Sequence, residues 1–109
     1  MHRIAEEQDV DRLFQAELAI LYKHSLTCGV CAAALGEVEA FLSQYPDADV
    51  YIIDVLAQRA LSQRIAARAG IRHESPQIIL FQRGTPRWSE SHYGITAAAL
   101  AEQFRLARH

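Results

Sequence analysis

The two cysteines of this chain lie in one motif, Cys28-Gly29-Val30-Cys31, between a predicted strand and a predicted helix. The run before them, 18–22, is continuously apolar, which is typical of a strand buried on both faces. A short loop over 24–27 leads from this strand to the motif. Apolar residues then recur at helical spacing: Cys31, Ala34, Leu35, Val38, Phe41, Leu42 and Tyr45. No further cysteine remains for a long-range disulfide.

The segments around this junction predict further helices and strands. Upstream, a short helix capped by Asp9 is predicted from three apolar residues at helical spacing: Val10, Leu13 and Phe14. Downstream, 49–55 has the composition of a second buried strand. A helix that ends at Gly70 follows, with an apolar edge formed by Leu61, Ile65 and Ala69.

The last third of the chain predicts a hairpin and a closing helix. Residues 77–81 form a third predicted strand, and the turn signal at 83–86 returns the chain as an antiparallel edge strand over 87–93. Thr96 is the expected cap of the last helix. The whole order predicts one α/β domain over 1–109, with a four-stranded mixed sheet flanked by helices. This order alone is compatible with several α/β folds.

Composition and charge narrow the functional classes. The formal net charge of −2 offers no electrostatic basis for binding nucleic acid or an anionic membrane. No segment approaches the roughly 20 apolar residues of a membrane span, and the first eleven residues lack the apolar stretch of a signal peptide. We therefore expect a cytoplasmic protein, in which a close cysteine pair is more often catalytic or metal-binding than structural.

The spacing of the two cysteines suits thiol–disulfide exchange. With Cys28 at the helix start and Cys31 one turn further, the sulfurs share a face and can bridge. The free N–H groups of the first turn and the helix dipole favour a negative sulfur at Cys28, which lowers a thiol pKa from about 8.5 into the range of roughly 3.5–7.5. Because the thiolate is the attacking species, we expect Cys28 to attack a disulfide and the less exposed Cys31 to resolve the mixed disulfide.

Two other interpretations of the cysteine pair stay open. The pair is either half of a zinc or iron–sulfur site shared between two chains, or two ordinary core residues. A zinc site needs four ligands, and none of the five histidines is paired at a ligand spacing: His2, His24, His73, His92 and His109. No metal site is therefore predicted within one chain.

Polar residues flank the motif and the third strand. A cation at Lys23 or His24 would stabilise the Cys28 thiolate or attract a carboxylate of a small thiol. Thr27 has a hydroxyl that could reach the sulfur. Glu74, together with the histidine before it, is expected to line a substrate groove. For each of these residues a plain role in a solvated loop is the alternative.

The span from Tyr22 to Leu100 resembles the thioredoxin superfamily and, more narrowly, the monothiol bacilliredoxins. The resemblance is carried by three groups of residues: Lys23-His24-Ser25 before Thr27-Cys28, then His73-Glu74-Ser75-Pro76-Gln77, and finally Trp88, Ser91-His92 and Ile95-Thr96. It implies a thioredoxin-like three-layer fold with a cis peptide bond at Pro76, where Ser75 and Pro76 align the substrate backbone. It also implies removal of bacillithiol, a low-molecular-weight thiol, from S-thiolated client proteins. No bound cofactor is expected.

The cysteine motif departs from this family's pattern. Monothiol members typically have a proline after the active cysteine and a serine three positions on, where this chain has Gly29 and Cys31. A monothiol enzyme passes its mixed disulfide to another thiol, whereas this chain would release bacillithiol by closing Cys28–Cys31. The strand over 18–22 also lacks the buried acid of thioredoxins. A general reductase of protein disulfides, without a preferred small thiol, is the remaining alternative.

Overall fold

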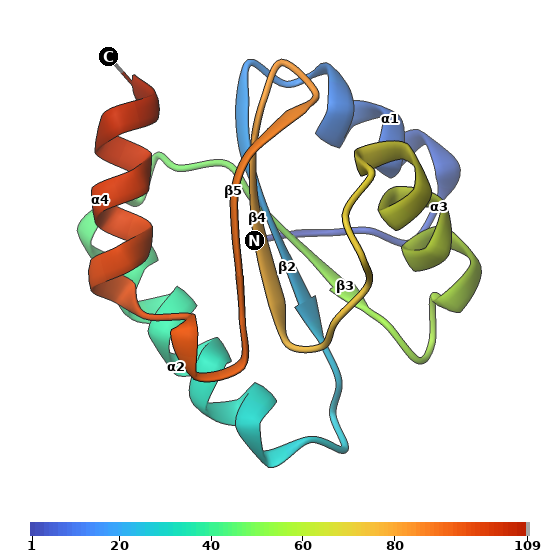
Figure 1. Cartoon of the computed structure of the whole chain (residues 1–109), viewed down its shortest axis with the longest axis horizontal. Coiled ribbons are helices and arrows are strands. Elements are labelled where there is room, and N and C mark those ends of the chain that lie inside the picture. The colour runs from blue at the N-terminus through green and yellow to red at the C-terminus, as the bar shows by residue number, and fades with distance from the viewer. Residues whose placement is uncertain (109) are drawn as a thin grey trace.

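The computed structural model describes residues 1–108 as one sheet with helices on both faces (Figure 1). In chain order the elements are β1 (His2–Arg3), α1 (Glu7–Gln15), β2 (Leu18–His24), α2 (Gly29–Gln44), β3 (Val50–Asp54), α3 (Arg59–Ala69), β4 (Gln77–Gln82), β5 (Thr85–Ser91), the 3₁₀ turn η1 (His92–Gly94) and α4 (Ala97–Arg108). The strands lie in the order β1-β3-β2-β4-β5.

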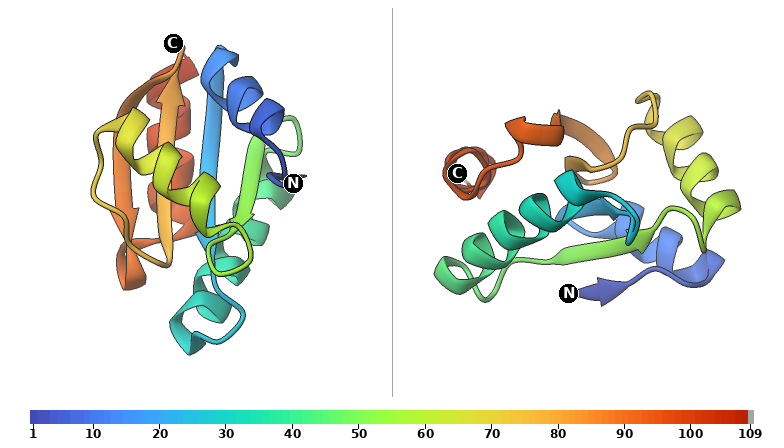
Figure 2. Two further views of the ribbon diagram at one scale, coloured as in Figure 1. Left: turned by 90° about the vertical axis from the view of Figure 1, so that its right-hand side faces the viewer. Right: turned by 90° about the horizontal axis from the view of Figure 1, so that it is seen from below.

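The sheet is mixed and lies between two helical layers. β1, β3 and β2 are parallel, whereas β4 runs antiparallel to β2, and β5 antiparallel to β4. Helices α1 and α3 cover one face, and α2 and α4 cover the other (Figure 1, Figure 2). This is the three-layer α/β arrangement of thioredoxin-like proteins, with β2 at its centre.

The expected count of four strands was wrong, because a fifth strand, β1, pairs with β3. Residues 2 and 3 lie opposite Tyr51 and Ile52, and the Ile4 amide continues the pairing by donating to the Ile52 carbonyl at 2.9 Å. A two-residue strand with exposed polar side chains has no hydrophobic alternation. The sequence of this segment therefore does not predict a strand, and the segment is extended because it pairs with the free edge of β3.

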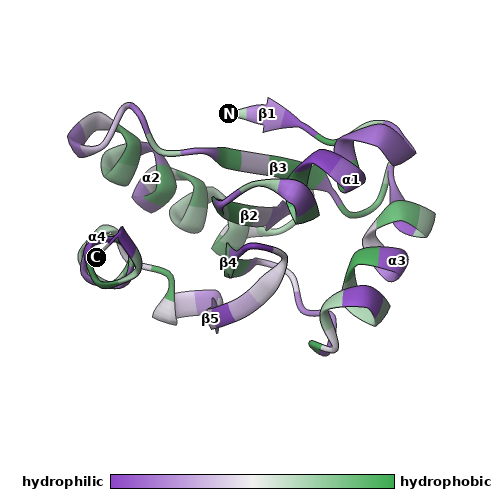
Figure 3. Cartoon of the chain, turned by 90° about the horizontal axis from the view of Figure 1, so that it is seen from above, coloured by the Kyte–Doolittle hydropathy of each residue, from purple (hydrophilic) through white to green (hydrophobic). Residues whose placement is uncertain are grey.

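The alternation of side chains along the strands divides the core in two. Leu21, Ile53 and Ile79 pack with α1 and α3, whereas Tyr22 and its neighbours Ile20 and Ile78 pack with α2 and α4. Figure 3 shows hydrophobic central strands enclosed by the helices, and mostly hydrophilic edge strands β1 and β5. Successive residues of β2 therefore point into different helical layers.

Two of the three expected helix caps are confirmed. The Ala99 amide donates to the Thr96 hydroxyl at 3.1 Å, and Gly70 ends α3 in the left-handed region with φ 69°. The cap expected at Asp9 is wrong, since the N-cap residue of α1 is Glu6, three residues earlier. Asp9 lies inside the first turn, where its carboxylate accepts hydrogen bonds from the amides of residues 5 and 6, each at 2.9 Å.

The edge strand β5 occupies 85–91 rather than the expected 87–93. The hairpin turn before it consists of only Arg83 and Gly84, with φ of 51° and 79°. Two positive φ values in a two-residue loop match the twist of a hairpin. The strand ends where His92, with φ 53°, opens η1. This turn carries the chain to α4 and contacts α2.

Candidate active site

The two cysteines lie where β2 passes into α2. Figure 1 shows the loop after β2, the first turn of α2 and the start of β4 at the same end of the sheet. Because α2 begins at Gly29, Cys28 is its N-cap residue and Cys31 lies one turn inside. Both are free thiols. Cys28 is half-buried, whereas Cys31 is fully buried.

The environment of Cys28 favours a negative sulfur. The neighbouring Cys31 thiol lowers the pKa of Cys28 most, and the backbone amides of Cys31 and Val30 lower it further. The Cys28 side chain closes no short capping bond to the first turn, so these amides act mainly as dipoles directed at the sulfur. Of the two thiols, the half-exposed Cys28 is therefore the one whose environment favours the thiolate.

The environment of Cys31 favours the neutral thiol. Burial raises the pKa of Cys31 most, and the neighbouring Cys28 raises it as well. The Ser25 amide and the Ser75 hydroxyl act in the opposite direction, with the Ser75 oxygen 3.8 Å from the Cys31 sulfur. The two thiols therefore have opposite tendencies, as a nucleophile and a resolving thiol require.

The segment before β4 completes this side of the site. The Ser75–Pro76 peptide bond is cis, Pro76 is buried, and its carbonyl accepts a hydrogen bond from the His92 amide at 3.1 Å. The buried Gln77 side chain donates to the Arg72 carbonyl at 3.0 Å and accepts from the Glu74 amide at 3.3 Å. Gln77 thus holds the 72–76 segment in place through two side-chain hydrogen bonds. Its place in the sequence motif did not predict this role.

Lys23 does not contact the cysteines. It is fully buried, and the alternation of β2 places it on the α1/α3 face, opposite α2. Its ammonium lies 3.2 Å from His73 Nδ1. Burial lowers the pKa of Lys23 to about 8, although the charge of Glu74 offsets part of this effect. Burial and the Lys23 charge also lower the pKa of His73.

The other residues that flank the motif also differ in whether they contact a cysteine. His24 is buried on the α2/α4 side and contacts the Tyr22 hydroxyl. Thr27 is exposed, and its hydroxyl contacts the Ser25 hydroxyl at 3.1 Å rather than a sulfur. Glu74 is exposed. Of the residues expected around the motif, the structure brings Ser75 into contact with a cysteine.

Tyr22 also contacts the segment that carries the dithiol, although the sequence predicted it only as part of the buried strand over 18–22. Its ring is fully buried, but its hydroxyl donates to the Cys31 carbonyl at 3.0 Å. Burial raises its pKa most, and the nearby charges of Cys31 and Cys28 raise it further. The period of two between Tyr22 and His24 was the available signal, since it puts both on one face of the strand.

Exposed apolar side chains lie near Cys28. Leu26 is 82% exposed two residues before Cys28, and Tyr93 of η1 is 79% exposed. A hollow of about 230 Å³ lies against the first turns of α2, between Val30 and Ala33 on one side and Tyr93 and Thr96 on the other. Val30, two residues after Cys28, lines this hollow, whereas Cys28 itself does not.

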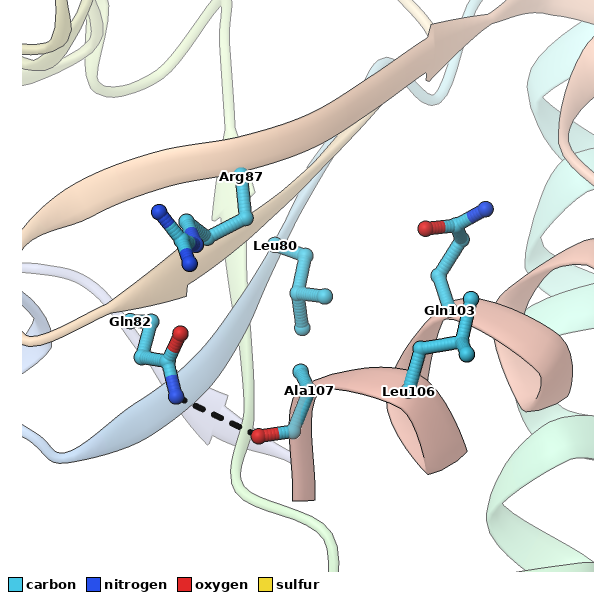
Figure 4. A pocket seen from close by; sticks show the side chains of 6 residues that line it. All are labelled: Leu80, Gln82, Arg87, Gln103, Leu106 and Ala107. Atoms are coloured by element: carbon cyan, nitrogen blue, oxygen red, sulfur yellow. Dashed lines mark hydrogen bonds between the residues drawn. The ribbon is translucent and has the colours of Figure 1, made fainter. Parts of the chain in front are cut away.

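A second hollow, of about 450 Å³, lies at the far end of the sheet (Figure 4). It is lined by Leu80, Gln82, Arg87, Gln103, Leu106 and Ala107. Gln82 donates across it to the Ala107 carbonyl at 3.2 Å. Among the residues that the structure describes, its lining includes no cysteine, histidine or acidic side chain.

Metal-ligating residues do not converge in the described part of the chain. Within residues 1–108, no three side chains of histidine, cysteine, aspartate or glutamate are grouped so that they could hold a metal ion. His109 lies outside the described residues. Over the same residues, no helix is both long and apolar enough to cross a membrane.

Comparison with solved structures places the fold. A chain described as a candidate oxidoreductase with a thioredoxin fold is 28% identical, with a TM-score of 0.86 over 99% of this chain and 93% of that chain. A mutant thioredoxin from Halobacterium salinarum NRC-1 is 23% identical, with a TM-score of 0.77 over 99% and 90%. Plasmodium falciparum thioredoxin is 15% identical, with a TM-score of 0.76 over 97% and 98%. The two thioredoxins show the fold.

Comparison with family models identifies the family. The model described as monothiol bacilliredoxin BrxC matches residues 2–100. The match covers the cysteine motif, the Ser75-Pro76 segment and the start of α4. The chain therefore belongs to the monothiol bacilliredoxin family, as a thioredoxin-fold, oxidoreductase-like member with a second cysteine in its motif.

Proposed function

We propose that this protein is a dithiol oxidoreductase that removes bacillithiol, or a similar small thiol, from S-thiolated protein cysteines. One observation carries the proposal: the two thiols one helical turn apart differ in exposure, and their pKa values are shifted in opposite directions. Two inert core thiols would both be buried and neutral. We expect the reaction to take place in the cytoplasm, with no bound cofactor.

In the first step the Cys28 thiolate attacks the bacillithiol sulfur of the mixed disulfide on the client. The Cys28–bacillithiol bond forms, and the bond between bacillithiol and the client breaks. The client cysteine leaves as a thiolate and takes a proton from water. The lowered pKa of Cys28 favours this step because only the thiolate attacks.

In the second step Cys31 resolves the enzyme-bound mixed disulfide. Its thiol loses a proton, the Cys28–Cys31 bond forms, and bacillithiol leaves as a thiolate that is protonated by water. The disulfide has moved from the client to the enzyme, so a reductant that supplies two electrons, either a dithiol or two small thiols, must restore the enzyme. The amide of Ser25 and the hydroxyl of Ser75 favour the Cys31 thiolate during this step.

The surrounding residues have different parts in substrate binding. The Ser75 hydroxyl lies 3.8 Å from the Cys31 sulfur, and the backbone of Ser75 and Pro76 would align the bound disulfide. Glu74 and Thr27 are exposed at the rim, where they can meet a polar substrate. Lys23 is buried, so its charge would act on a substrate carboxylate only through the His73–Glu74 segment. His24 would act through Tyr22.

The test follows bacillithiol release from an S-bacillithiolated protein, with a glutathionylated protein as the comparison. Wild type is expected to release the small thiol and to end as the Cys28–Cys31 disulfide. Cys28→Ser is expected to be inactive, and Cys31→Ser to stop as an adduct of one bacillithiol on Cys28. If wild type releases neither thiol, the proposal fails.

Two further measurements separate the alternatives. The first is the reduction of insulin disulfides with a dithiol donor. A rate higher than that with either S-thiolated protein would favour a general disulfide reductase. Zinc or iron that co-purifies with the protein, together with slow titration of both thiols, would favour a metal-binding module shared between two chains.

A further inference from the structure

A buried network of two hydrogen bonds connects β2, at the centre of the sheet, to Cys31, the proposed resolving cysteine. His24 Nδ1 lies 2.7 Å from the Tyr22 hydroxyl, and that hydroxyl donates to the Cys31 carbonyl at 3.0 Å. Tyr22 is fully buried and His24 is 8% exposed. Both residues point toward α2 because they are two positions apart on β2.

The Tyr22 hydroxyl determines which group donates in each of these two hydrogen bonds. A tyrosine hydroxyl has one proton, and here that proton goes to the Cys31 carbonyl. The short contact with the imidazole is then made by His24 Nδ1 as the donor. His24 therefore orients the Tyr22 hydroxyl, and Tyr22 holds the peptide that carries Cys31.

The contact with Cys31 is an addition to ordinary helix bonding. A carbonyl in the first turn of an α-helix already accepts the amide four residues further on. The Tyr22 hydroxyl gives this carbonyl a second donor that comes from the sheet, so the first turn of α2 is tied to β2. A phenylalanine would fill the same apolar space without this tie.

The hydrogen bond from Tyr22 is one of several contacts that hold Cys31 in place. The Ser75 hydroxyl lies 3.8 Å from its sulfur, the Ser25 amide also acts on that sulfur, and Tyr22 holds its carbonyl. For the resolving step, the Cys31 sulfur must meet the Cys28 sulfur while a small thiol is attached there. A turn free to shift would spend less time in that geometry.

We propose that Tyr22 and His24 are positioning residues for the resolving step, which keep the Cys31 thiol in place to attack the Cys28 mixed disulfide. This inference rests on the dithiol exchange proposed above. In the step it affects, the Cys31–Cys28 bond forms, the bond from Cys28 to the small thiol breaks, and one proton leaves Cys31 while the departing thiolate gains one. Neither Tyr22 nor His24 changes its covalent state.

The test is a single-turnover reaction of the reduced enzyme with an S-bacillithiolated protein, stopped by acid and analysed by mass spectrometry. The fraction of enzyme with attached bacillithiol reports the first step, and its conversion to the internal disulfide reports the second. Tyr22→Phe is expected to form the adduct at the wild-type rate but to resolve it about fivefold to tenfold more slowly, the equivalent of one hydrogen bond. His24→Leu should do the same.

Two variants distinguish positioning from general stability. His24→Asn offers an N–H donor near the place of Nδ1 and is expected to restore resolution to within about twofold of wild type. Tyr51→Phe removes the hydroxyl of another buried tyrosine, in the other half of the core, and should leave both steps unchanged. Resolution at the wild-type rate in Tyr22→Phe, or equal slowing of both steps, would overturn the inference.

A second measurement does not depend on bacillithiol being the substrate. Equilibration with mixtures of glutathione and glutathione disulfide gives the effective concentration of Cys31 toward a mixed disulfide on Cys28. Tyr22→Phe should lower that concentration by the same about fivefold to tenfold. If wild type fails with bacillithiolated protein but shows this difference, the inference stands and the substrate assignment fails. An unchanged value in Tyr22→Phe would refute the inference.

Discussion

Replacing Lys23 by methionine is expected to stabilise the protein at neutral pH while weakening its activity. Lys23 is the only lysine of the chain and is fully buried. Among the described residues, the one hydrogen-bond partner of its ammonium is His73 Nδ1, a neutral acceptor. Methionine has a similar length and no charge. A buried charge with few partners costs more free energy than an apolar side chain of similar volume.

The size of the effect follows from the pKa of Lys23, which burial lowers from 10.5 to about 8. That difference corresponds to roughly 3 kcal/mol against the charged form in the folded protein. The lost hydrogen bond to His73 offsets about 1 kcal/mol. Lys23→Met should therefore raise the free energy of unfolding at pH 7 by about 2 kcal/mol.

The pH dependence has a definite sign. Below pH 8, Lys23 is charged in both the folded and the unfolded states, and the full penalty is present. Between about pH 8 and 10.5 the folded protein has lost the proton while the unfolded chain keeps it, so stability rises with pH. The advantage of Lys23→Met should therefore shrink by roughly 2–3 kcal/mol between pH 7 and pH 10.

The assay is urea unfolding from pH 7 to pH 10 in a Cys28→Ser, Cys31→Ser background, with and without the Lys23→Met substitution. That background removes thiol titration, and the tyrosines contribute equally to both proteins. Selective ¹³C labelling of lysine reports the pKa directly, because only one lysine gives a signal. A Lys23→Met protein that is less stable at pH 7, or a difference that does not change with pH, would refute the reasoning.

The same substitution in the active dithiol protein tests whether the buried charge has a function. We expect a lower kcat/KM for an S-bacillithiolated substrate, because the positive charge beneath the His73–Glu74 segment is lost. A gain in stability with unchanged kcat/KM would show that Lys23 has no part in substrate recognition.

Three other predictions concern the thiols and the hairpin. The alkylation rate of Cys28 with iodoacetamide should have its midpoint below the pKa of an ordinary thiol, and Cys31→Ala should raise that midpoint, since the Cys31 thiol lowers the Cys28 pKa most; an unchanged midpoint would contradict this cause. Ser75→Ala removes the hydroxyl 3.8 Å from the Cys31 sulfur, so the mixed disulfide should accumulate in single-turnover mass spectrometry, and prompt resolution would exclude that role. Gly84→Ala would put a Cβ 2.7 Å from the Phe14 carbonyl oxygen at φ 79°, and should cost roughly 1–3 kcal/mol in urea unfolding. Gly36→Ala, whose Cβ would meet nothing within 4 Å, is the matched control, and equal effects of the two substitutions would be evidence against strain at the turn.

Local sequence was sufficient for the features that depend on near neighbours. The strand-to-helix junction at Cys28, the left-handed cap at Gly70 and the hydroxyl cap at Thr96 involve residues a few positions apart. Hydrophobic period and cap chemistry act over that distance, so they could be interpreted without the fold. The cap at Asp9 was misplaced because Asp9 binds amides that precede it, and a helix start can slide by one turn.

The tertiary structure decided most of the polar contacts around the site. Lys23 and His24 are adjacent in sequence, yet the pleat of β2 sends them into opposite helical layers, to His73 and to Tyr22. The Ser75 hydroxyl reaches the Cys31 sulfur across 44 residues of chain, and β1 exists only because β3 offers it an edge. The sequence by itself determined where the dithiol lies, and it predicts Cys28 as the nucleophile. The residues that contact Cys31 depend on how strands and helices distant in the chain pack together. A local sequence pattern carries no information about such long-range contacts.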